Sequence, residues 1–218
     1  RLATDIAFEI REAGRSKRKK NPKSSNLLDG EIIRHKNGSP IKVPGKFKCV
    51  KAIGWYVSEY NRAQISINFT NYKISPVHQV FDAVCDLAVE RGLRVTGSEL
   101  VGLIPKSALI DAGKYYLKKQ GRSLGVSESD IIECAVQSLG LNDVSQFNTK
   151  EKIIEFAIEV KKDSLLNLST NDLERNLFET RKKIEKLARA DQLKSLYICS
   201  FSSRSIVYKV MFLAEMLA

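Results

Sequence analysis

The sequence lacks the features that mark membrane-spanning and zinc-binding proteins. No apolar run approaches the roughly 20 residues that a helix needs to cross a bilayer, and no signal peptide is recognisable. The 4 cysteines stand far apart without a CxxC pair, so we expect free thiols buried in apolar surroundings rather than a metal site or disulfides. These absences predict a cytoplasmic chain that binds neither metal nor membrane.

Acidic residues are also in short supply. The 218 residues include 36 Lys and Arg but only 25 Asp and Glu, which gives a formal net charge of +11. This excess suits an anionic partner, such as nucleic acid, an acidic membrane surface or a small polycarboxylate. The hydrophobic fraction of 43% is enough for one sizeable core or two small ones.

The clearest local pattern is a strand in the middle of the chain. Apolar side chains alternate there with polar ones: Ala63, Ile65, Ile67 and Phe69 with Gln64, Ser66, Asn68 and Thr70. Because successive side chains of a strand point to opposite faces, the pattern predicts one apolar face and one row of hydrogen-bonding groups. Residues 50–57 predict a preceding strand, joined to this one by a short hairpin loop.

The stretch that follows predicts a helix and a third strand. Ser75 and Pro76 are expected to cap and open a helix that ends at Gly92, and Leu93 starts the strand. Residues 211–217 predict a short C-terminal helix. Further helices are predicted up to Gly14, from Pro105 to Gly121, from the capping-box residue Ser127 to Gly140, and from the cap Thr149 onward.

A basic segment interrupts the regular pattern at residues 15–46. Its Lys, Arg, Gly and Pro content is typical of a long mobile connection. A basic cluster is also a candidate nucleic-acid patch, but this one lacks the interleaved aromatic side chains on which single strands stack. We therefore favour a solvated loop that adds positive field, and keep a non-catalytic module that binds nucleic acid as the alternative.

Several strings in fixed order resemble one enzyme family. VKAIGWYV, AQISINFTNY, VTGSELVGLIP, ALIDAGKYYL and FNTKEKIIEF are similar to glutamate formimidoyltransferase, the folate-dependent half of formimidoyltransferase-cyclodeaminase. The similarity begins with IAFEIREAGR, ends near Ile158, and corresponds to the second, C-terminal subdomain of the transferase unit. The resemblance implies transfer of a formimidoyl group from N-formimidoyl-glutamate to N5 of tetrahydrofolate, in histidine catabolism and one-carbon metabolism.

The same resemblance implies a partial enzyme. The family's catalytic histidine lies in the first subdomain, so neither His35 nor His78 is expected to be catalytic. We expect tetrahydrofolate and N-formimidoyl-glutamate to bind when the missing subdomain completes the site, and negligible turnover by this chain alone. We also expect a homodimer.

The fold that the resemblance implies is α/β: a ferredoxin-like split βαββαβ subdomain without its first strand, followed by helices and a short α/β tail. The absent strand is expected at the centre of the sheet, between the second and the fourth. Its loss would leave backbone groups on both neighbours unpaired, which predicts an aggregation-prone or dimer-seeking chain.

The tail resembles a different enzyme. LERNLFETRKKIEKL and LYICSFSSRSIVYKVMFLAEML are similar to part of the glutaminase domain of the large glutamate synthase subunit. That family's nucleophile is an amino-terminal cysteine, so Cys199 is not expected to serve as one. We predict a formimidoyltransferase-like part at residues 1–160, with the basic insertion, a junction at 161–171 and a glutaminase-like fragment at 172–218.

The candidate folate- or substrate-binding residues lie on the second and third predicted strands: Gln64, Ser66, Asn68, Thr70, Ser98 and Glu99. The ordinary interpretation of the polar row is the wet face of an antiparallel sheet. Glu99 is the sharper signal, because unpaired carboxylates are seldom buried in apolar strands. Trp55 is expected in a core or interface rather than beneath a pterin ring. No catalytic residue and no metal ligand is predicted.

Overall fold

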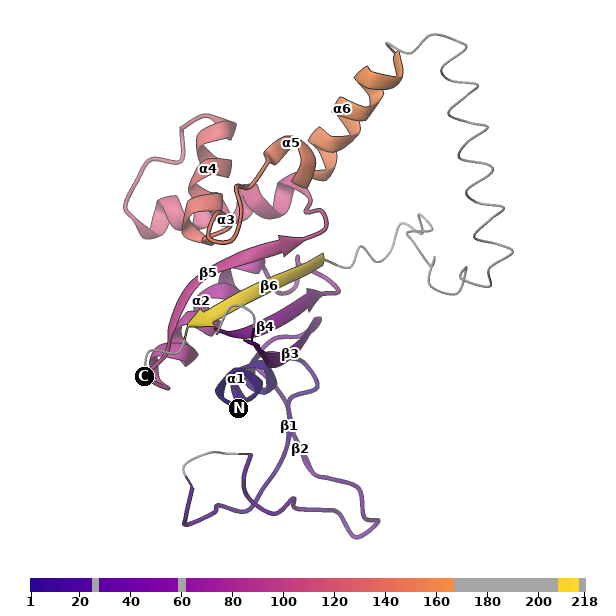
Figure 1. Cartoon of the computed structure of the whole chain (residues 1–218), viewed down its shortest axis with the longest axis vertical. Coiled ribbons are helices and arrows are strands. Elements are labelled where there is room, and N and C mark those ends of the chain that lie inside the picture. The colour runs from indigo at the N-terminus through magenta and orange to yellow at the C-terminus, as the bar shows by residue number, and fades with distance from the viewer. Residues whose placement is uncertain (25–27, 59–61, 167–207, 216–218) are drawn as a thin grey trace, which may run out of the picture.

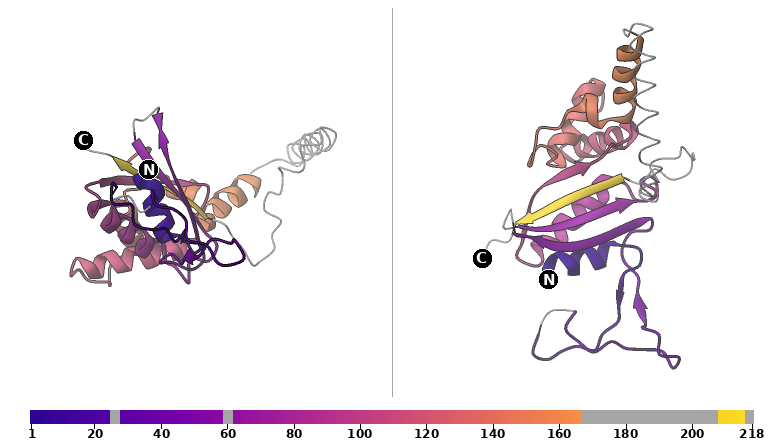
Figure 2. Two further views of the ribbon diagram at one scale, coloured as in Figure 1. Left: turned by 90° about the horizontal axis from the view of Figure 1, so that it is seen from below. Right: turned by 45° about the vertical axis from the view of Figure 1, so that its right-hand side comes forward.

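A four-stranded antiparallel sheet forms the centre of the molecule (Figures 1 and 2). The computed structural model describes residues 1–24, 28–58, 62–166 and 208–215. The strands lie in the order β3 (Val50–Val57), β4 (Arg62–Phe69), β6 (Tyr208–Glu215) and β5 (Arg94–Val101), and every neighbouring pair is antiparallel. The predicted α/β class is therefore confirmed, and the three strands predicted from the central stretch lie in one sheet.

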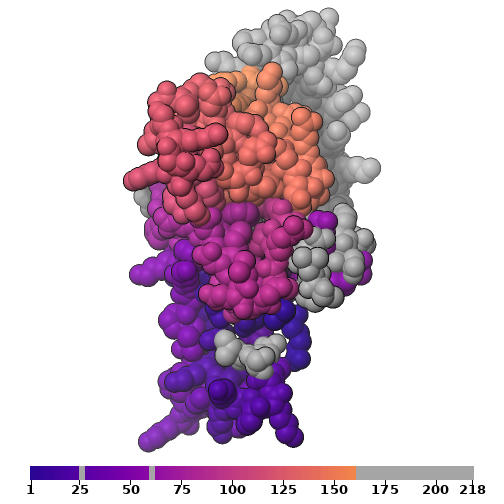
Figure 3. All heavy atoms as spheres, turned by 90° about the vertical axis from the view of Figure 1, so that its left-hand side faces the viewer, coloured from indigo at the N-terminus to yellow at the C-terminus, as the bar shows by residue number. Residues whose placement is uncertain are grey.

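The basic segment forms a folded arm that projects from the body. β1 (Arg15–Ser16) pairs with β2 (Lys42–Val43) at its base, and isolated antiparallel bridges continue the pairing outward. We call residues 15–46 the basic arm; it forms one end of the molecule (Figures 1 and 3). The sequence predicts an irregular connection here, whereas backbone hydrogen bonds such as that from Lys17 to the carbonyl of Ile41 organise it.

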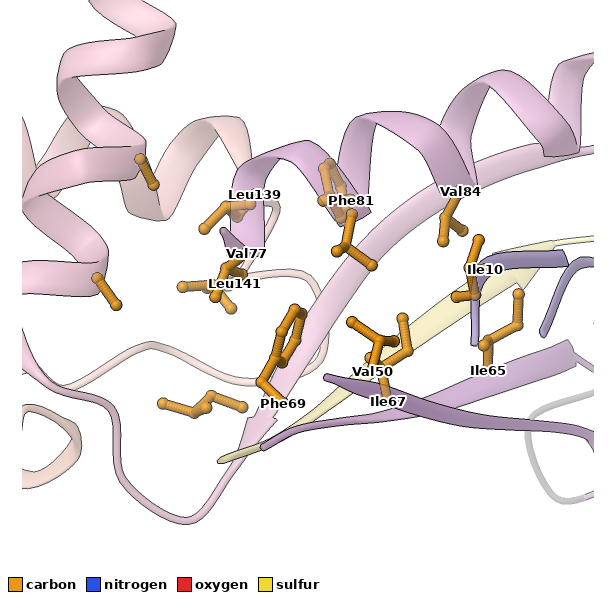
Figure 4. Close-up of a cluster of buried hydrophobic side chains, with 14 of the residues drawn as sticks. Ile10, Val50, Ile65, Ile67, Phe69, Val77, Phe81, Val84, Leu139 and Leu141 are labelled. Atoms are coloured by element: carbon orange, nitrogen blue, oxygen red, sulfur yellow. The ribbon is translucent and has the colours of Figure 1, made fainter. Parts of the chain in front are cut away.

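Two helices cover one face of the sheet. α1 (Leu2–Ile10) packs on β3 and β4, and α2 (Val77–Val89) lies against α1 and β5. The apolar face predicted for β4 points toward them, and Ile65, Ile67 and Phe69 are fully buried (Figure 4). Burial of each such side chain stabilises the fold by about 1.5–3 kcal/mol, so this face holds the sheet and helices together.

Four further helices lie beyond β5 (Figure 1). They are α3 (Lys106–Lys119) and α4 (Glu128–Ser138), which pack together, and α5 (Thr149–Lys152) and α6 (Ile154–Leu166). The single helix predicted from Thr149 is wrong, because Ile153 is extended and fully buried and forms a parallel bridge with Ile104. The backbone leaves the helical path where this side chain enters the core.

Helix α1 ends at Ile10, four residues before the predicted end at Gly14, whereas the other predicted helix ends lie close to the observed ones. The capping chemistry is only partly as predicted. Ser75 does not cap α2, because its hydroxyl donates to the carbonyl oxygen of Lys48 at 2.6 Å. Asn148 rather than Thr149 caps α5. The predicted cap at Ser127 is confirmed by the hydrogen bond that its side chain accepts. The glycines predicted to end helices all have positive φ angles of 57–71°: Gly14, Gly92, Gly121 and Gly140.

The C-terminal strand β6 corrects two predictions. Residues 211–217 are predicted to be helical, but residues 208–215 form a strand. A short apolar run is ambiguous between helix and strand, and here the open backbone groups of two neighbouring strands accommodate it. The resemblance places the central strand between the second and fourth strands of the layout, whereas β6 lies between β4 and β5, its third and fourth. The unpaired edges expected on its neighbours are therefore paired.

Several predictions lie outside the described residues, among them Cys199. Within the described ranges, Cys49, Cys85 and Cys134 are free thiols, half-buried rather than buried. No helix in that part of the chain is long and apolar enough to cross a membrane. The division of the chain near residues 161–171 stays a prediction.

Candidate functional site on the outer sheet face

The sheet face opposite α1 and α2, called here the outer face, carries the polar row of β4. Its residues alternate with the buried apolar ones: Lys51, Ile53 and Trp55 on β3, and Gln64, Ser66 and Asn68 on β4. The register pairs these six across the two strands as Lys51 with Asn68, Ile53 with Ser66, and Trp55 with Gln64. Side chains paired in this way lie about 5 Å apart at Cβ, so each polar group of the row adjoins one β3 side chain.

Burial on this face is the reverse of the usual pattern. The polar residues Gln64 and Ser66 are only 4% and 6% exposed, whereas Ile53 and Trp55 are 55% and 37% exposed. The cause is position, because β4 is an interior strand and β3 is an edge strand. Exposed apolar side chains bordered by polar groups are typical of a surface that contacts a ligand or another polypeptide.

The side chain of Asn68 is the least satisfied group of the row. Its carbonyl oxygen Oδ1 is buried and accepts no hydrogen bond from the described part of the chain. Leaving a buried acceptor unpaired costs about 1–3 kcal/mol, so native proteins keep few such groups, and a donor from a ligand is one way to satisfy them. Asn68 Oδ1 is therefore the best acceptor on the outer face for a donor supplied from outside.

Glu99 shares the outer face but lies two strands away from the row. The register places Ser66 opposite Met211, and Met211 opposite Glu99. Two inter-strand steps of about 4.8 Å separate the backbones of Ser66 and Glu99, so a ligand about 10 Å long is required to contact both. Glu99 is partly exposed, and no ion pair joins it to another described residue.

Ser98 and Thr70 do not join this group. Ser98 is fully buried on the helix-covered side, where its hydroxyl donates to the carbonyl oxygen of Leu139 at 2.6 Å. Thr70 lies past the end of β4 and donates to the carbonyl oxygen of Cys49 at 3.1 Å. The structure thus brings four of the six candidates to one face, and gives the other two hydrogen bonds that hold the fold.

An ion pair that the sequence did not predict joins the start of β4 to a loop beside β5. Arg62 on β4 reaches Asp143, in the loop after α4, at 3.6 Å. Gly97 makes this approach possible, because an added Cβ would lie 2.4 Å from Cβ of Asp143. Asp143 follows the predicted helix end at Gly140, but nothing in the local pattern indicated its partner.

A second polar cluster, between α2 and α3, was also not predicted from the sequence. Asp82 accepts hydrogen bonds from the Tyr115 hydroxyl at 2.8 Å, the Tyr116 hydroxyl at 2.9 Å and the Lys119 ammonium at 2.7 Å. His78 is 6% exposed, and its ring stacks on that of Tyr115 with a centroid distance of 4.4 Å. The spacing of four between His78 and Asp82, and between Tyr115 and Lys119, is the signal that puts each pair on one helix face.

Electrostatics suit this cluster to a structural role. Burial alone would raise the pKa of Asp82, but the hydrogen bonds from Lys119 and the two tyrosines outweigh it, so the pKa lies below its ordinary value. Burial lowers the pKa of His78 against the opposing fields of Asp111 and Asp82, and its Nδ1 is buried without a hydrogen-bond partner among the described residues. The histidine is therefore neutral, and the carboxylate already has three donors.

Comparison with known families shows which family the chain belongs to. The Formiminotransferase domain family model matches residues 1–159, which include the whole outer face except β6. The chain belongs to this family. As a formiminotransferase domain it is 41% identical over 141 residues to formimidoyltransferase-cyclodeaminase of Gallus gallus, covering 62% of this chain and 26% of the relative. It is 37% identical over 114 residues to glutamate formimidoyltransferase of Thermoplasma acidophilum, covering 52% and 35%.

The C-terminal part of the chain matches a second family. A model of class-II glutamine amidotransferases covers residues 125–218. Over 50 residues the chain is 48% identical to the large chain of NADPH glutamate synthase from Azospirillum brasilense, covering 23% of this chain and 3% of the relative. Both resemblances are thus confirmed. The chain spans about a quarter to a third of the length of the formimidoyltransferases above.

Proposed function

We propose that the chain is part of a folate-dependent glutamate formimidoyltransferase and that its outer face contributes to the substrate site. The reaction moves the formimidoyl group of N-formimidoyl-glutamate to tetrahydrofolate and releases glutamate. The observation that carries the proposal is the unpaired Oδ1 of Asn68, in a polar row that belongs to a formiminotransferase domain. The names of the relatives support the reaction class.

The chemistry of the substrate fits the groups on the outer face. A protonated formimidoyl group is an amidinium, which presents N–H donors and no acceptor, so it matches either the Asn68 carbonyl oxygen or, two strands away, the Glu99 carboxylate. The glutamate part carries two carboxylates, which match the ammonium of Lys51 beside Asn68. The net charge of +11 attracts the anionic folate and its polyglutamate over longer distances.

We further propose that this chain has negligible turnover alone. Proton transfer in such a reaction needs a general acid or base of the protein within hydrogen-bond reach of the substrate. The two histidines do not serve the outer face, because His78 is buried between α2 and α3 and His35 lies in the basic arm. The exposed apolar side chains of Ile53 and Trp55 suit contact with the remainder of the transferase unit or with a second copy, as in a cytoplasmic homodimer.

The single tryptophan gives a direct test of binding. Trp55 lies on the outer face beside Gln64, so its fluorescence reports on a ligand there. We expect 5-formyltetrahydrofolate, a stable folate, to quench it saturably, and Asn68→Ala to weaken the apparent affinity about tenfold, the equivalent of one lost hydrogen bond to a charged or polar donor. Gln79→Ala, an exposed amide on α2, is the matched control and should bind normally.

The outcome separates the parts of the proposal. No saturable quenching by folate or by N-formimidoyl-glutamate, at concentrations where the protein stays folded, would contradict an outer face that binds substrate without the other subdomain. Measurable formimidoyl transfer by the purified chain would contradict the proposed lack of turnover. Normal binding by Asn68→Ala would remove this residue from the site.

A second candidate function is supported by the charge of the basic arm. Residues 15–46 contain 10 of the 36 Lys and Arg side chains and only 2 of the 25 Asp and Glu, so they carry eight of the eleven net positive charges. Lys17, Lys20, Lys23 and Lys36 are exposed and form no ion pair with the described residues. A projecting arm of this kind fits a polyphosphate backbone.

The salt dependence of nucleic-acid binding tests this alternative. If the arm neutralises four phosphates, the affinity for a labelled single-stranded oligonucleotide falls with a log–log salt slope of about −3. The variant with Lys17, Lys20, Lys23 and Lys36 changed to Gln should abolish the slope, whereas four exposed lysines outside the arm serve as control: Lys73, Lys114, Lys118 and Lys150. Equal binding by both variants would reject the arm as a nucleic-acid site.

A further inference from the structure

Strand β6 comes last in the described chain and yet lies inside the sheet. It pairs with β4 along Ala63–Phe69 and with β5 along Arg94–Val101, antiparallel on both sides (Figure 2). β4 and β5 do not pair with each other. Among the described residues, β6 is therefore the segment through which the two halves of the sheet are hydrogen-bonded.

The end of β6 lies near the start of α1. Glu215 pairs with Arg94, the first residue of β5. Close by in sequence, Arg91 donates hydrogen bonds at 2.8 Å to the carboxylates of Asp5 and Glu9 in α1. Figures 1 and 2 show the tip of the β6 arrow and the N-terminus at the same end of the sheet. A strand in the position and direction of β6 is thus placed to lead into α1.

We propose that β6 completes the formiminotransferase domain by taking the position of a strand that would precede α1. Taken in the order β6, α1, β3, β4, α2, β5, the elements follow a βαββαβ layout with every sheet neighbour antiparallel. The arrangement is that of a circularly permuted chain. The segment that matches class-II glutamine amidotransferases supplies this strand, so the two family matches fold as one unit.

The physical reason is the cost of an unpaired interior. Ile65, Ile67 and Leu100 on the two neighbouring strands are at most 3% exposed, so the strand edges that flank β6 lie in the buried interior of the sheet. Backbone N–H and C=O groups in such a position must be paired. Without β6, two open strand edges would face each other and recruit an extended segment from another molecule.

Two truncations test the proposal. A chain ending at residue 215 should melt like the full chain, because it keeps all of β6. A chain ending at residue 207 should lose the cooperative melt, and the amides of β4 and β5 should exchange with solvent at least a hundredfold faster. Equal protection of these amides in both truncations would overturn the proposal.

A permuted chain guards against a truncation that simply fails to fold. In it, residues 205–218 precede Arg1 through a short Gly-Ser linker, and the chain ends at residue 166. We expect a folded monomer with the amide protection of the full chain, and loss of that protection when Val210→Pro removes an interior strand N–H. An unfolded permutant, or a full chain that is a dimer through exchange of β6 between copies, would each contradict a strand supplied in cis.

Discussion

Asn68 on β4 lies opposite Lys51 on β3, and the two side chains differ sharply in their surroundings. Asn68 Oδ1 is buried without a hydrogen-bond partner among the described residues, whereas Lys51 is exposed. An acceptor without a donor thus sits beside a cation with free access to water. This pairing suits a ligand that brings both N–H groups and carboxylates, and it predicts a conflict between stability and binding at Asn68.

We expect Asn68→Val to stabilise the protein and to impair binding. Valine removes the unpaired acceptor and favours the strand conformation, so the free energy of unfolding should rise by about 1 kcal/mol. Denaturation in urea measures the change, and folate-induced stabilisation in the same experiment should be lost. The conflict would be disproved if Asn68→Val destabilised the fold, because Oδ1 would then have a partner in the free protein.

The acid sensitivity of the fold should depend on one of its two histidines. Burial depresses the pKa of His78 in the folded state, so the unfolded state binds the proton more readily. The stability associated with His78 is then complete above the unfolded pKa of about 6.5 and is lost as the pH falls below it. We expect the melting temperature to drop between pH 7 and pH 5, and His78→Gln to flatten that profile.

His35 is the matched control for this experiment. It lies exposed in the basic arm, so His35→Gln should leave the pH profile as it is in the parent chain. A profile between pH 7 and pH 5 that His78→Gln leaves equally steep would contradict the assignment of the acid sensitivity to His78, because Asp82 acts in a lower pH range. The pKa of Asp82 is depressed, so its contribution is lost at lower pH, below its unfolded value of about 3.9.

The thiol of Cys85 should be unusually slow to react. Burial, followed by the charges of Asp82 and Asp86, raises its pKa to about 11. Because the thiolate is the nucleophile, the folded protein at pH 8 should be alkylated by iodoacetamide at this position on the order of 100-fold more slowly than the unfolded chain. Peptide mass spectrometry after timed quenching measures the rate. A rate in the folded state close to that in urea would contradict the raised pKa.

The sequence predicted those parts of the fold in which a regular residue pattern reflects burial against neighbouring elements on one side. Strand β4 was predictable because its alternation of Ile65 and Ile67 with Ser66 reflects the helices on one side only. β6 was not, since the apolar run at Val210–Leu213 has no alternation and its conformation depends on two strands more than 100 residues earlier. Pairing with strands that are distant in sequence produces no periodic pattern within the paired segment itself.

The same reasoning explains the candidate site. Gln64, Ser66 and Asn68 could be assigned to one face from their spacing alone, and they share it. Ser98 and Glu99 are adjacent in sequence and point to opposite sides, so only one of them could lie on that face. The pattern did not tell which of the two, because the hydrogen bond from Ser98 to the carbonyl of Leu139 spans 41 positions.

Gly97 tests how closely the α4–α5 loop packs on the sheet. A Cβ at this position would lie 2.4 Å from Cβ of Asp143 and 2.8 Å from the carbonyl oxygen of Gly140. The second contact is with backbone, so rotation of a side chain cannot relieve it. We expect Gly97→Ala to lower the free energy of unfolding by about 1–3 kcal/mol, the usual cost of overpacking, and to weaken the ion pair between Arg62 and Asp143.

Gly125→Ala supplies the comparison. The nearest atom to a Cβ at Gly125 is the Ser123 hydroxyl oxygen at 3.5 Å, which is an ordinary contact. The φ angle of Gly125 is not in the left-handed region. Urea denaturation should therefore place Gly125→Ala within about 0.5 kcal/mol of the parent chain, as for most exposed substitutions. If Gly97→Ala were equally mild, the loop that carries Asp143 would have to move away at little cost, and the ion pair to Arg62 would not hold it against β5.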